Sequence, residues 1–237
     1  MTASRVLIIT TSHETLGNTK QKTGLWLEEL TTPYYAFVDA GALVTIASIQ
    51  GGAVPIDPGS QKAKGENSPS VERFYTDAAA QKAVANTPSI TDVKASDYDA
   101  VFLPGGHGTM WDFPQSNCLS IIISEALAKG SIVSAVCHGP AGLIAAETAT
   151  GESVVKGRKV AAFTDAEESA VGLTETVPFL LESRLRELGA DIHKADNFEA
   201  CVAVDGNLIT GQNPMSSELV AEKVLGLILV PTLAQLT

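Results

Sequence analysis

Short runs of apolar and β-branched residues alternate with helical patterns along most of this chain. The runs are Arg5 to Thr10, Leu43 to Ile49, Asp97 to Pro104, Ser131 to Val136, Lys159 to Phe163 and Leu208 to Thr210. A helical pattern from about Gly24 to Ala40 joins the first two runs. Strands that alternate with helices are typical of a mostly parallel sheet covered on both faces. We therefore predict a doubly wound, flavodoxin-like α/β fold, in which a ligand lies beyond the carboxyl ends of the strands.

The size and charge of the chain limit its organisation and its partners. Its 237 residues fit one α/β domain, and we predict a single domain over residues 1–237. Hydrophobic residues make up 45% of the chain, which is enough for a large core. The net charge of −11 disfavours nucleic acid and anionic membrane surfaces as partners. Residues 51–70, rich in Gly, Pro, Ser and charge, predict a surface loop that could serve as a lid.

Neither end of the chain shows a pattern typical of export or membrane insertion. The apolar stretch from Val6 to Ile9 is too short for the core of a signal peptide. The apolar run from Val224 to Val230 is far below the ~20 residues that a membrane-spanning helix needs. The cysteines Cys118, Cys137 and Cys201 are odd in number and form no CxxC pair. This favours free thiols in a reducing compartment, so we predict a cytoplasmic protein.

The most informative segment is the strand from Ser131 to Val136, which is followed at once by Cys137 and small residues. In a nucleophile elbow, the residues two before and two after the nucleophile must be small, because a strained turn brings them nearly into contact. Ala135 and Gly139 occupy these positions. A helix that begins here would direct its N–H groups at the sulfur and lower the pKa of Cys137. We therefore predict that Cys137 is a nucleophile, reactive near neutral pH.

A thiolate that attacks a carbonyl generates an oxyanion, which needs hydrogen-bond donors already in place. The candidate donors are the N–H of His138, directly after the nucleophile, and the N–H of Gly106, in the turn after Pro104. An ordinary tight turn is the alternative interpretation of Gly105 and Gly106. The spacing of the glycines does not match the dinucleotide fingerprint GxGxxG, so we predict no nicotinamide cofactor.

Other cysteines and histidines offer weaker signals. A buried, unreactive thiol is the alternative for Cys137, and it is the interpretation that we favour for Cys118 and Cys201. The histidines are His13, His107, His138 and His193. None shows the clustered spacing that is typical of zinc ligands. We predict neither a metal ion nor any other cofactor.

Several motifs taken together resemble the ThiJ/PfpI superfamily, which has a class I glutamine-amidotransferase-like fold. They are TGLWLEEL near the N-terminus, FLPGGHG after a strand and AVCHGPAGL at the elbow. The segments KTGLWLEELTTPYYAF, FTDAEE and TGQNPMSS are similar to the branch that contains glutathione-independent glyoxalases (glyoxalase III) and holding chaperones of the heat-shock type. The resemblance spans nearly the whole chain. It implies a homodimer and a cofactor-independent lyase of the D-lactate dehydratase type that acts in the stress response.

The resemblance also implies roles for residues near Cys137. It places Glu29 against the cysteine, where a carboxyl group can act as a proton shuttle, and turns Glu28 to another side of the helix. From the residues alone, an exposed acidic pair is the alternative. The expected substrate pocket includes Gly105, His107 and Trp26.

The resemblance further implies an acidic residue against the histidine of the elbow, His138, to orient and charge it. The segment FTDAEES supplies this residue. We assign the role to Glu168, and Glu167 and Asp165 remain rivals.

The implied reaction converts methylglyoxal, or another 2-oxoaldehyde, to lactate or the matching 2-hydroxy acid. Cys137 would add to the aldehyde carbon, and Glu29 and His138 would move a proton between the two carbons. Water would then hydrolyse the thioester. A cysteine-dependent amidase or peptidase is one alternative, and a holding chaperone without catalysis is another; protein repair could accompany the glyoxalase activity. A thiolate of low pKa would also be open to oxidation.

Overall fold

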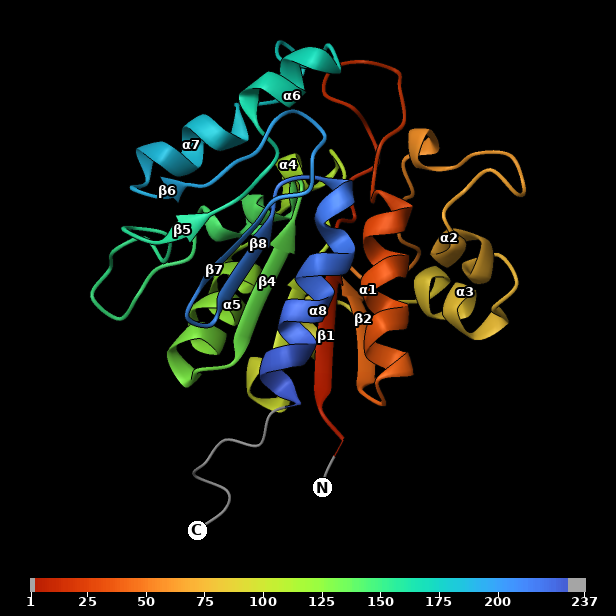
Figure 1. Cartoon of the computed structure of the whole chain (residues 1–237), viewed down its shortest axis with the longest axis horizontal. Helices are drawn as coiled ribbons and strands as arrows, with labels where there is room; N and C mark the ends of the chain where they lie inside the picture. Colours follow the sequence, from red (N-terminus) through yellow and green to blue (C-terminus); the bar gives the residue numbers. More distant parts are fainter. Residues whose placement is uncertain (1–2, 230–237) are drawn as a thin grey trace.

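The centre of the fold is a six-stranded sheet. The structure, a computed structural model, describes residues 3–229, and in this part the strands lie in the order β2-β1-β3-β4-β8-β7 (Figure 1). The strands are β1 (Arg5–Thr10), β2 (Leu43–Ser48), β3 (Ala100–Leu103), β4 (Ile132–Val136), β7 (Val202–Asp205) and β8 (Leu208–Gly211). Neighbouring strands are parallel except for β7, which runs antiparallel to β8. The predicted doubly wound α/β fold is confirmed.

Helices cover both faces of this sheet. The helices of the described chain are α1 (Leu27–Asp39), α2 (Pro69–Phe74), α3 (Ala78–Ala85), α4 (Thr109–Asp112), α5 (Asn117–Lys129), α6 (Asp165–Ala170), α7 (Leu181–Glu187) and α8 (Ser217–Ile228). Short 3₁₀ helices span Pro58–Ser60, Ile90–Asp92, Ala95–Asp97, Gly139–Leu143 and Pro214–Ser216. In β1, Leu7 and Ile9 join the core that includes residues of α5, whereas Val6 joins the core with residues of α1 and α8. Burial on both faces explains why this strand is apolar from Val6 to Ile9.

The run from Lys159 to Phe163 does not join the central sheet, so this part of the prediction is wrong. Only β5 (Lys159–Val160) is a strand, and it pairs with β6 (Asp191–Ile192) in a separate parallel sheet. The place beside β4 belongs to β8. The partner strand β7 reaches β8 through the two-residue turn Gly206-Asn207, a hairpin signal that the sequence analysis missed.

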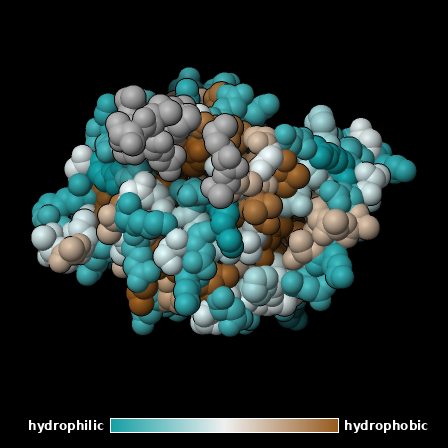
Figure 2. Space-filling model, turned by 90° about the horizontal axis from the view of Figure 1, so that it is seen from below, coloured by the Kyte–Doolittle hydropathy of each residue, from teal (hydrophilic) through white to brown (hydrophobic). Residues whose placement is uncertain are grey.

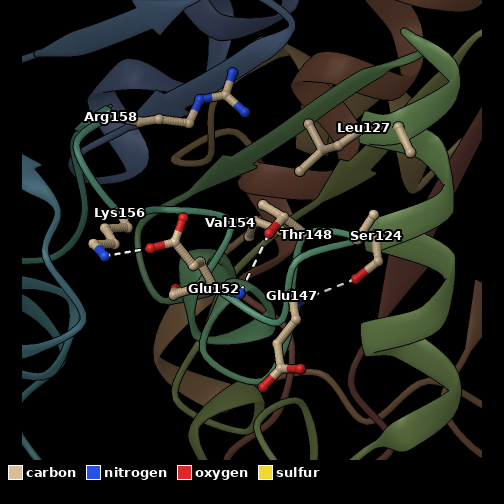
Figure 3. Close-up of a pocket in the computed structure, with 11 residues that line it drawn as sticks. Ser124, Leu127, Glu147, Thr148, Glu152, Val154, Lys156 and Arg158 are labelled. Atoms are coloured by element: carbon tan, nitrogen blue, oxygen red, sulfur yellow. Dashed lines mark hydrogen bonds and ion pairs between the residues drawn. The ribbon is translucent and has the colours of Figure 1, made fainter.

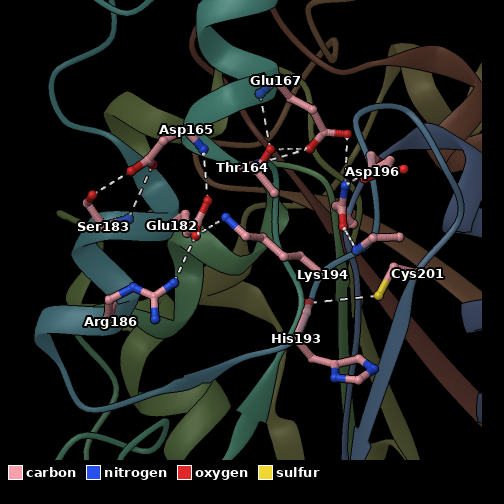
Figure 4. Close-up of polar contacts among 12 residues, drawn as sticks. Thr164, Asp165, Glu167, Glu182, Ser183, Arg186, His193, Lys194, Asp196 and Cys201 are labelled. Carbon is pink, nitrogen blue, oxygen red and sulfur yellow. Dashed lines mark hydrogen bonds and ion pairs between the residues drawn. The ribbon is translucent and has the colours of Figure 1, made fainter.

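Residues 159–200, here called the cap, contain β5, α6, α7 and β6. In Figure 1 the cap lies over the carboxyl ends of the central strands, with α6 at the top. At its start, the N–H of Phe163 donates to the carbonyl of Cys137 at 2.9 Å. Within it, the buried Glu182 accepts a hydrogen bond from Lys194 at 2.7 Å (Figure 4). Polar contacts therefore hold the cap both to itself and to the end of β4.

The predicted surface loop, residues 51–70, is fastened beside the start of α1. The N–H of Leu25 donates to the carbonyl of Pro55 at 2.8 Å, and the N–H of Asp57 donates back to the carbonyl of Leu25 at 2.9 Å. The hydroxyl of Thr23 also donates to the Asp57 carboxylate at 2.7 Å. These bonds hold residues 55–57 of the loop against residues 23–25, directly before α1.

In the part of the chain that the structure describes, no helix is long and apolar enough to cross a membrane. The apolar run from Val224 to Val230 begins inside α8, and Val230 lies outside the described residues. Val224 is fully buried against the core, whereas Leu227 is 47% exposed. The described part of this run therefore forms the end of a helix that packs on the sheet by one face.

Candidate active site

Cys137 follows directly on β4 and has a strained backbone. Its φ angle of 59° lies in the left-handed region, which residues other than glycine rarely adopt. Two hydrogen bonds hold this conformation. The Cys137 N–H donates to the carbonyl of Gly211 at 3.0 Å, and the Cys137 carbonyl accepts from the N–H of Phe163 at 2.9 Å. Such strain persists only where the surroundings determine it, and it is common at active sites.

The small flanking residues have the structural role that the elbow pattern predicts. A Cβ atom added to Gly139 would overlap the carbonyl oxygen of Leu103, at the end of β3. Ala135 is fully buried in β4. The elbow can therefore approach β3 only because Gly139 has no side chain.

The expected low pKa of Cys137 is wrong. The side chain is only 4% exposed, and burial raises the pKa of this thiol well above its ordinary value, with the neighbouring Glu29 as the second cause. The segment after the elbow is a five-residue 3₁₀ helix, Gly139–Leu143, and not the predicted α-helix, so it supplies little dipole. Cys137 is therefore a neutral thiol in the resting protein and needs a base.

Glu29 contacts the thiol of Cys137 and is fully buried, which excludes the exposed acidic pair for this residue. Its Oε2 accepts the N–H of Gly105 at 2.8 Å. Its Oε1 makes no regular hydrogen bond within residues 3–229, and the Cys137 thiol is its neighbour. Burial raises the pKa of Glu29 to about 8, although the contacts with Cys137 and Gly105 oppose the shift. Glu29 is therefore mainly a neutral carboxyl group at neutral pH.

His138 lies between the thiol and Glu168. Its Nδ1 is 3.2 Å from the sulfur of Cys137, and its Nε2 is 2.8 Å from Oε2 of Glu168. Burial, and next the nearby His107, lower the pKa of His138 to about 4. Burial alone would raise the pKa of Glu168, but hydrogen bonds from both histidines outweigh it and lower the pKa to about 2.

These ionisation states determine the tautomer of His138. A carboxylate accepts hydrogen bonds only, so the single proton of the neutral ring lies on Nε2 and is donated to Glu168. Nδ1 then presents a lone pair to the thiol of Cys137. The ring is oriented to act as a general base toward the sulfur.

The three rival acids of α6 have separate contacts. Glu168 alone contacts His138, whereas Glu167 accepts from the hydroxyl and the N–H of Thr164 at the start of α6, each at 2.9 Å. Asp165 accepts from Ser183 of α7 (Figure 4). The structure thus brings Glu168 into the site and uses the other two to hold the cap.

The two expected oxyanion donors lie against the sulfur. Hydrogen bonds from the N–H groups of Gly106 and His138 act on the Cys137 thiol and favour its ionised form. Gly106 has a φ of 98°, and a Cβ there would overlap the carbonyl oxygen of Gly24. The turn is therefore more than an ordinary connection, because its backbone N–H is aimed at the nucleophile.

Two residues that the sequence analysis missed complete the site. The hydroxyl of the buried Thr109 lies 2.9 Å from the carbonyl of Gly106 and 3.0 Å from that of His138, so it links the peptides that follow the two donor N–H groups. The ring of Phe163 packs on His138, with centroids 4.4 Å apart. A threonine directly after the GGHG turn was the available signal for the first contact; no sequence pattern indicated the second.

The remaining expected pocket residues surround the elbow. The N–H of Trp26, at the start of α1, donates to the carbonyl of Gly105 at 3.2 Å. Nε2 of His107 lies 2.8 Å from Oε1 of Glu168. Contrary to the expectation of scattered histidines, donor atoms of His107, His138 and Glu168 lie within 4.8 Å of one another, a set that could hold a metal ion.

Other candidate features lie away from the elbow. A pocket of about 330 Å³ between α5 and residues 147–158 contains Lys156, Glu152 and Arg158, and none of the predicted site residues (Figure 3). Cys118 and Cys201 are half-buried, and burial raises the pKa of each thiol. Only Cys137 has the surroundings of a nucleophile.

The fold and this site define an α/β protein with a buried cysteine, histidine and glutamate at a strand-to-helix elbow. The chain belongs to the DJ-1/PfpI family, whose family model matches residues 23–227. It is 31% identical over 227 residues to Glyoxalase 3 of Candida albicans, covering 93% of this chain and 96% of that protein.

Solved structures support the same relationship. The Rapid Encystment Protein of Francisella tularensis matches with a TM-score of 0.89 and 40% identity, covering 93% of this chain and 97% of that one. Glyoxalase III of Candida albicans matches with a TM-score of 0.86 and 30% identity, covering 95% and 97%. The chain is also 30% identical to the Glutathione-independent glyoxalase HSP31 of Saccharomyces cerevisiae, covering 93% of this chain and 96% of that protein. The resemblance inferred from the sequence is therefore confirmed.

Proposed function

We propose that this protein is a glutathione-independent glyoxalase that converts 2-oxoaldehydes such as methylglyoxal to 2-hydroxy acids such as lactate without a cofactor. The observation that carries the proposal is the buried sequence of contacts from Glu168 through His138 to Cys137, whose thiol also contacts the neutral Glu29. This arrangement offers a base and an acid to one nucleophile.

The first step is the addition of the thiol to the aldehyde. The proton of Cys137 moves to Nδ1 of His138 while the sulfur bonds to the aldehyde carbon, and Glu168 stabilises the imidazolium that forms. The N–H groups of Gly106 and His138 stabilise the oxyanion. A proton then returns to this oxygen, and the product is a hemithioacetal.

The second step moves hydrogen between the two substrate carbons. A base, His138 in its neutral form, removes the proton from the carbon bonded to sulfur, and Glu29 donates a proton to the neighbouring ketone oxygen. The His138 imidazolium returns its proton to the second carbon of the enediol, while the hydroxyl on the carbon bonded to sulfur gives its proton to the Glu29 carboxylate, and a thioester forms. Water hydrolyses the thioester, restores the thiol and releases the hydroxy acid. The net reaction adds one water molecule to the 2-oxoaldehyde and gives the 2-hydroxy acid.

The test is lactate formation from methylglyoxal in the absence of glutathione. Wild-type protein should turn over, and Cys137→Ala and Glu29→Gln should lose nearly all activity. His193→Gln, at an exposed residue of the cap, is the matched control for sample handling. Turnover that survives in Cys137→Ala would reject the proposal.

An amidase or peptidase would use the same nucleophile and donors. The low exposure of Cys137, at 4%, favours a small aldehyde over a peptide bond, which would need an open groove. Hydrolysis of a short peptide amide by the wild type, with no lactate formed from methylglyoxal, would favour the amidase.

A holding chaperone remains the second candidate function, because it needs exposed apolar surface and no thiol chemistry. The side chains of Leu219 and Leu227 in α8 are 41% and 47% exposed, and Leu229 is 52% exposed. From below, the surface shows apolar groups among hydrophilic ones (Figure 2). Suppression of aggregation by Cys137→Ala at the wild-type level would establish a chaperone role separate from catalysis. The same apolar surface could serve the proposed homodimer.

A further inference from the structure

The acid of the elbow is shared between two histidines. Oε2 of Glu168 lies 2.8 Å from Nε2 of His138, and Oε1 lies 2.8 Å from Nε2 of His107. The two imidazole rings are 4.1 Å apart between centroids. His107 belongs to the glycine turn after β3, His138 to the elbow and Glu168 to α6 of the cap, so three segments meet at one carboxylate.

Each histidine donates to a different oxygen, which fixes the carboxylate in its plane. A carboxylate held through one oxygen can rotate about its last bond, whereas one held through both cannot do so without breaking a hydrogen bond. Glu168 is only 2% exposed, so water does not readily replace a lost donor.

We infer that His107 is a positioning residue: by donating to Oε1 of Glu168, it holds the carboxylate that keeps the proton of His138 on Nε2 and the lone pair of Nδ1 toward Cys137. It acts through Glu168 and does not touch the sulfur. This inference deepens the proposed function, and it rests on that function for turnover but not for the reactivity of the thiol.

The second effect of His107 is electrostatic. Four ionisable side chains face His138. They are Cys137 beside it, His107 from the glycine turn, and Glu167 and Glu168 from α6. The ring of Phe163, which packs on His138, carries no charge. His107 lowers the pKa of His138, whereas the two glutamates raise it.

Two variants test the donor. His107→Gln keeps an N–H donor at about the position of Nε2. His107→Leu removes the donor and leaves Oε1 of Glu168 without its hydrogen bond. His193→Gln makes the same substitution at an exposed histidine and is the matched control.

The measurement is the rate of alkylation of Cys137 by iodoacetamide between pH 3.5 and 8, read by mass spectrometry of the peptide that contains Cys137. Peptides with Cys118 and Cys201 serve as internal references. His107→Leu should slow the reaction of Cys137 about 10-fold near neutral pH, the effect expected for one hydrogen bond to a charged group. His107→Gln, which keeps a donor to Oε1 of Glu168, should retain most of the wild-type rate. With methylglyoxal, kcat should fall and KM should change little.

Several outcomes would overturn the inference. They are a wild-type alkylation rate in His107→Leu and an equal loss of rate in the Leu and Gln variants. If His107→Leu does not fold, the rate of His107→Gln decides alone, and a loss of about 10-fold there would overturn the inference. Normal alkylation of the wild type without turnover of methylglyoxal would reject the glyoxalase proposal and leave the role of His107 standing.

Discussion

The elbow site and the pocket beside α5 both contain charged side chains, but they hold them differently. At the elbow, Glu168 is 2% exposed and Glu29 fully buried, and burial and hydrogen bonds move their pKa values in opposite directions, to about 2 and about 8. In the pocket, Lys156 and Glu152 form an ion pair with side chains 60% and 54% exposed. The protonated Glu29 can donate a proton, and the ionised Glu168 can hold the base His138. A solvated ion pair such as Lys156 and Glu152 offers neither role. The chemistry therefore belongs to the less open of the two regions.

The largest effect on stability is expected at Glu167. Its fully buried carboxylate accepts from Thr164, from the N–H of Phe198 at 2.8 Å, and from the amides of Gln212 and Asn213 at 3.1 and 2.9 Å. Glu167→Ala leaves these donors unpaired, and we expect a loss of about 4 kcal/mol in the free energy of unfolding, measured in urea. Glu167→Gln, which keeps part of the acceptor capacity, should lose less; an equal loss would mean that the hydrogen bonds are not the cause.

Glu168→Gln should affect activity more than stability. The change removes the negative charge that stabilises the His138 imidazolium but keeps the size of the side chain. We expect kcat for methylglyoxal to fall by about 10²-fold or more. If Glu168→Gln lowers kcat no more than the exposed substitution His193→Gln does, Glu168 has no role in turnover that Glu167 lacks.

Glu29→Gln should change how stability depends on pH. In the wild type, as the pH rises from 4.5 to about 8, the unfolded chain loses the proton of Glu29 while the folded protein keeps it. The folded state therefore loses stability over this window, by about 1.4 kcal/mol per pH unit at most. Glutamine does not ionise, so the variant should gain relative to the wild type between pH 5 and 7.5 in urea unfolding. Glu28→Gln is the control, because it makes the same substitution at the neighbouring position of α1. If the free energies of unfolding of Glu29→Gln and wild type differ by the same amount at every pH, the raised pKa of Glu29 is contradicted.

The smallest effect is expected in the pocket. Lys156→Ala breaks the exposed ion pair with Glu152 and should change the free energy of unfolding by less than about 0.5 kcal/mol. Activity with methylglyoxal should stay at the wild-type level. A large loss of either would show that the pocket is coupled to the elbow, and the contrast between the two regions would fail.

The sequence predicted the central sheet and the elbow because both depend on local patterns. β1, β2, β3, β4 and β8 coincide with apolar runs, and Cys137 follows β4 with small residues two positions before and two positions after it. The placement of β5 was wrong because a two-residue strand has too little pattern to reveal its partner. The same limit applies to β6.

The pKa of Cys137 and the contacts of α6 could not be derived from local patterns. Burial by the cap and by α1 raises this pKa, and sequence spacing does not report burial. Glu167 and Glu168 are adjacent on α6, and only the packing of the cap on the elbow decides which of them meets His138. The resemblance to a family chose correctly between candidates that the residues alone left equal.

The contact between Gly139 and β3 has a consequence for sequence variation. Gly139 carries no reacting atom, yet a Cβ there would overlap the carbonyl of Leu103 and push the elbow away from the glycine turn. A Cβ on Gly105 would likewise lie 2.6 Å from the N–H nitrogen of His138. In a library of all single substitutions selected for detoxification of methylglyoxal, both glycines should tolerate as few replacements as the nucleophile itself. Intolerance at a position is then a measure of how closely two backbones approach, and not only of which side chains react.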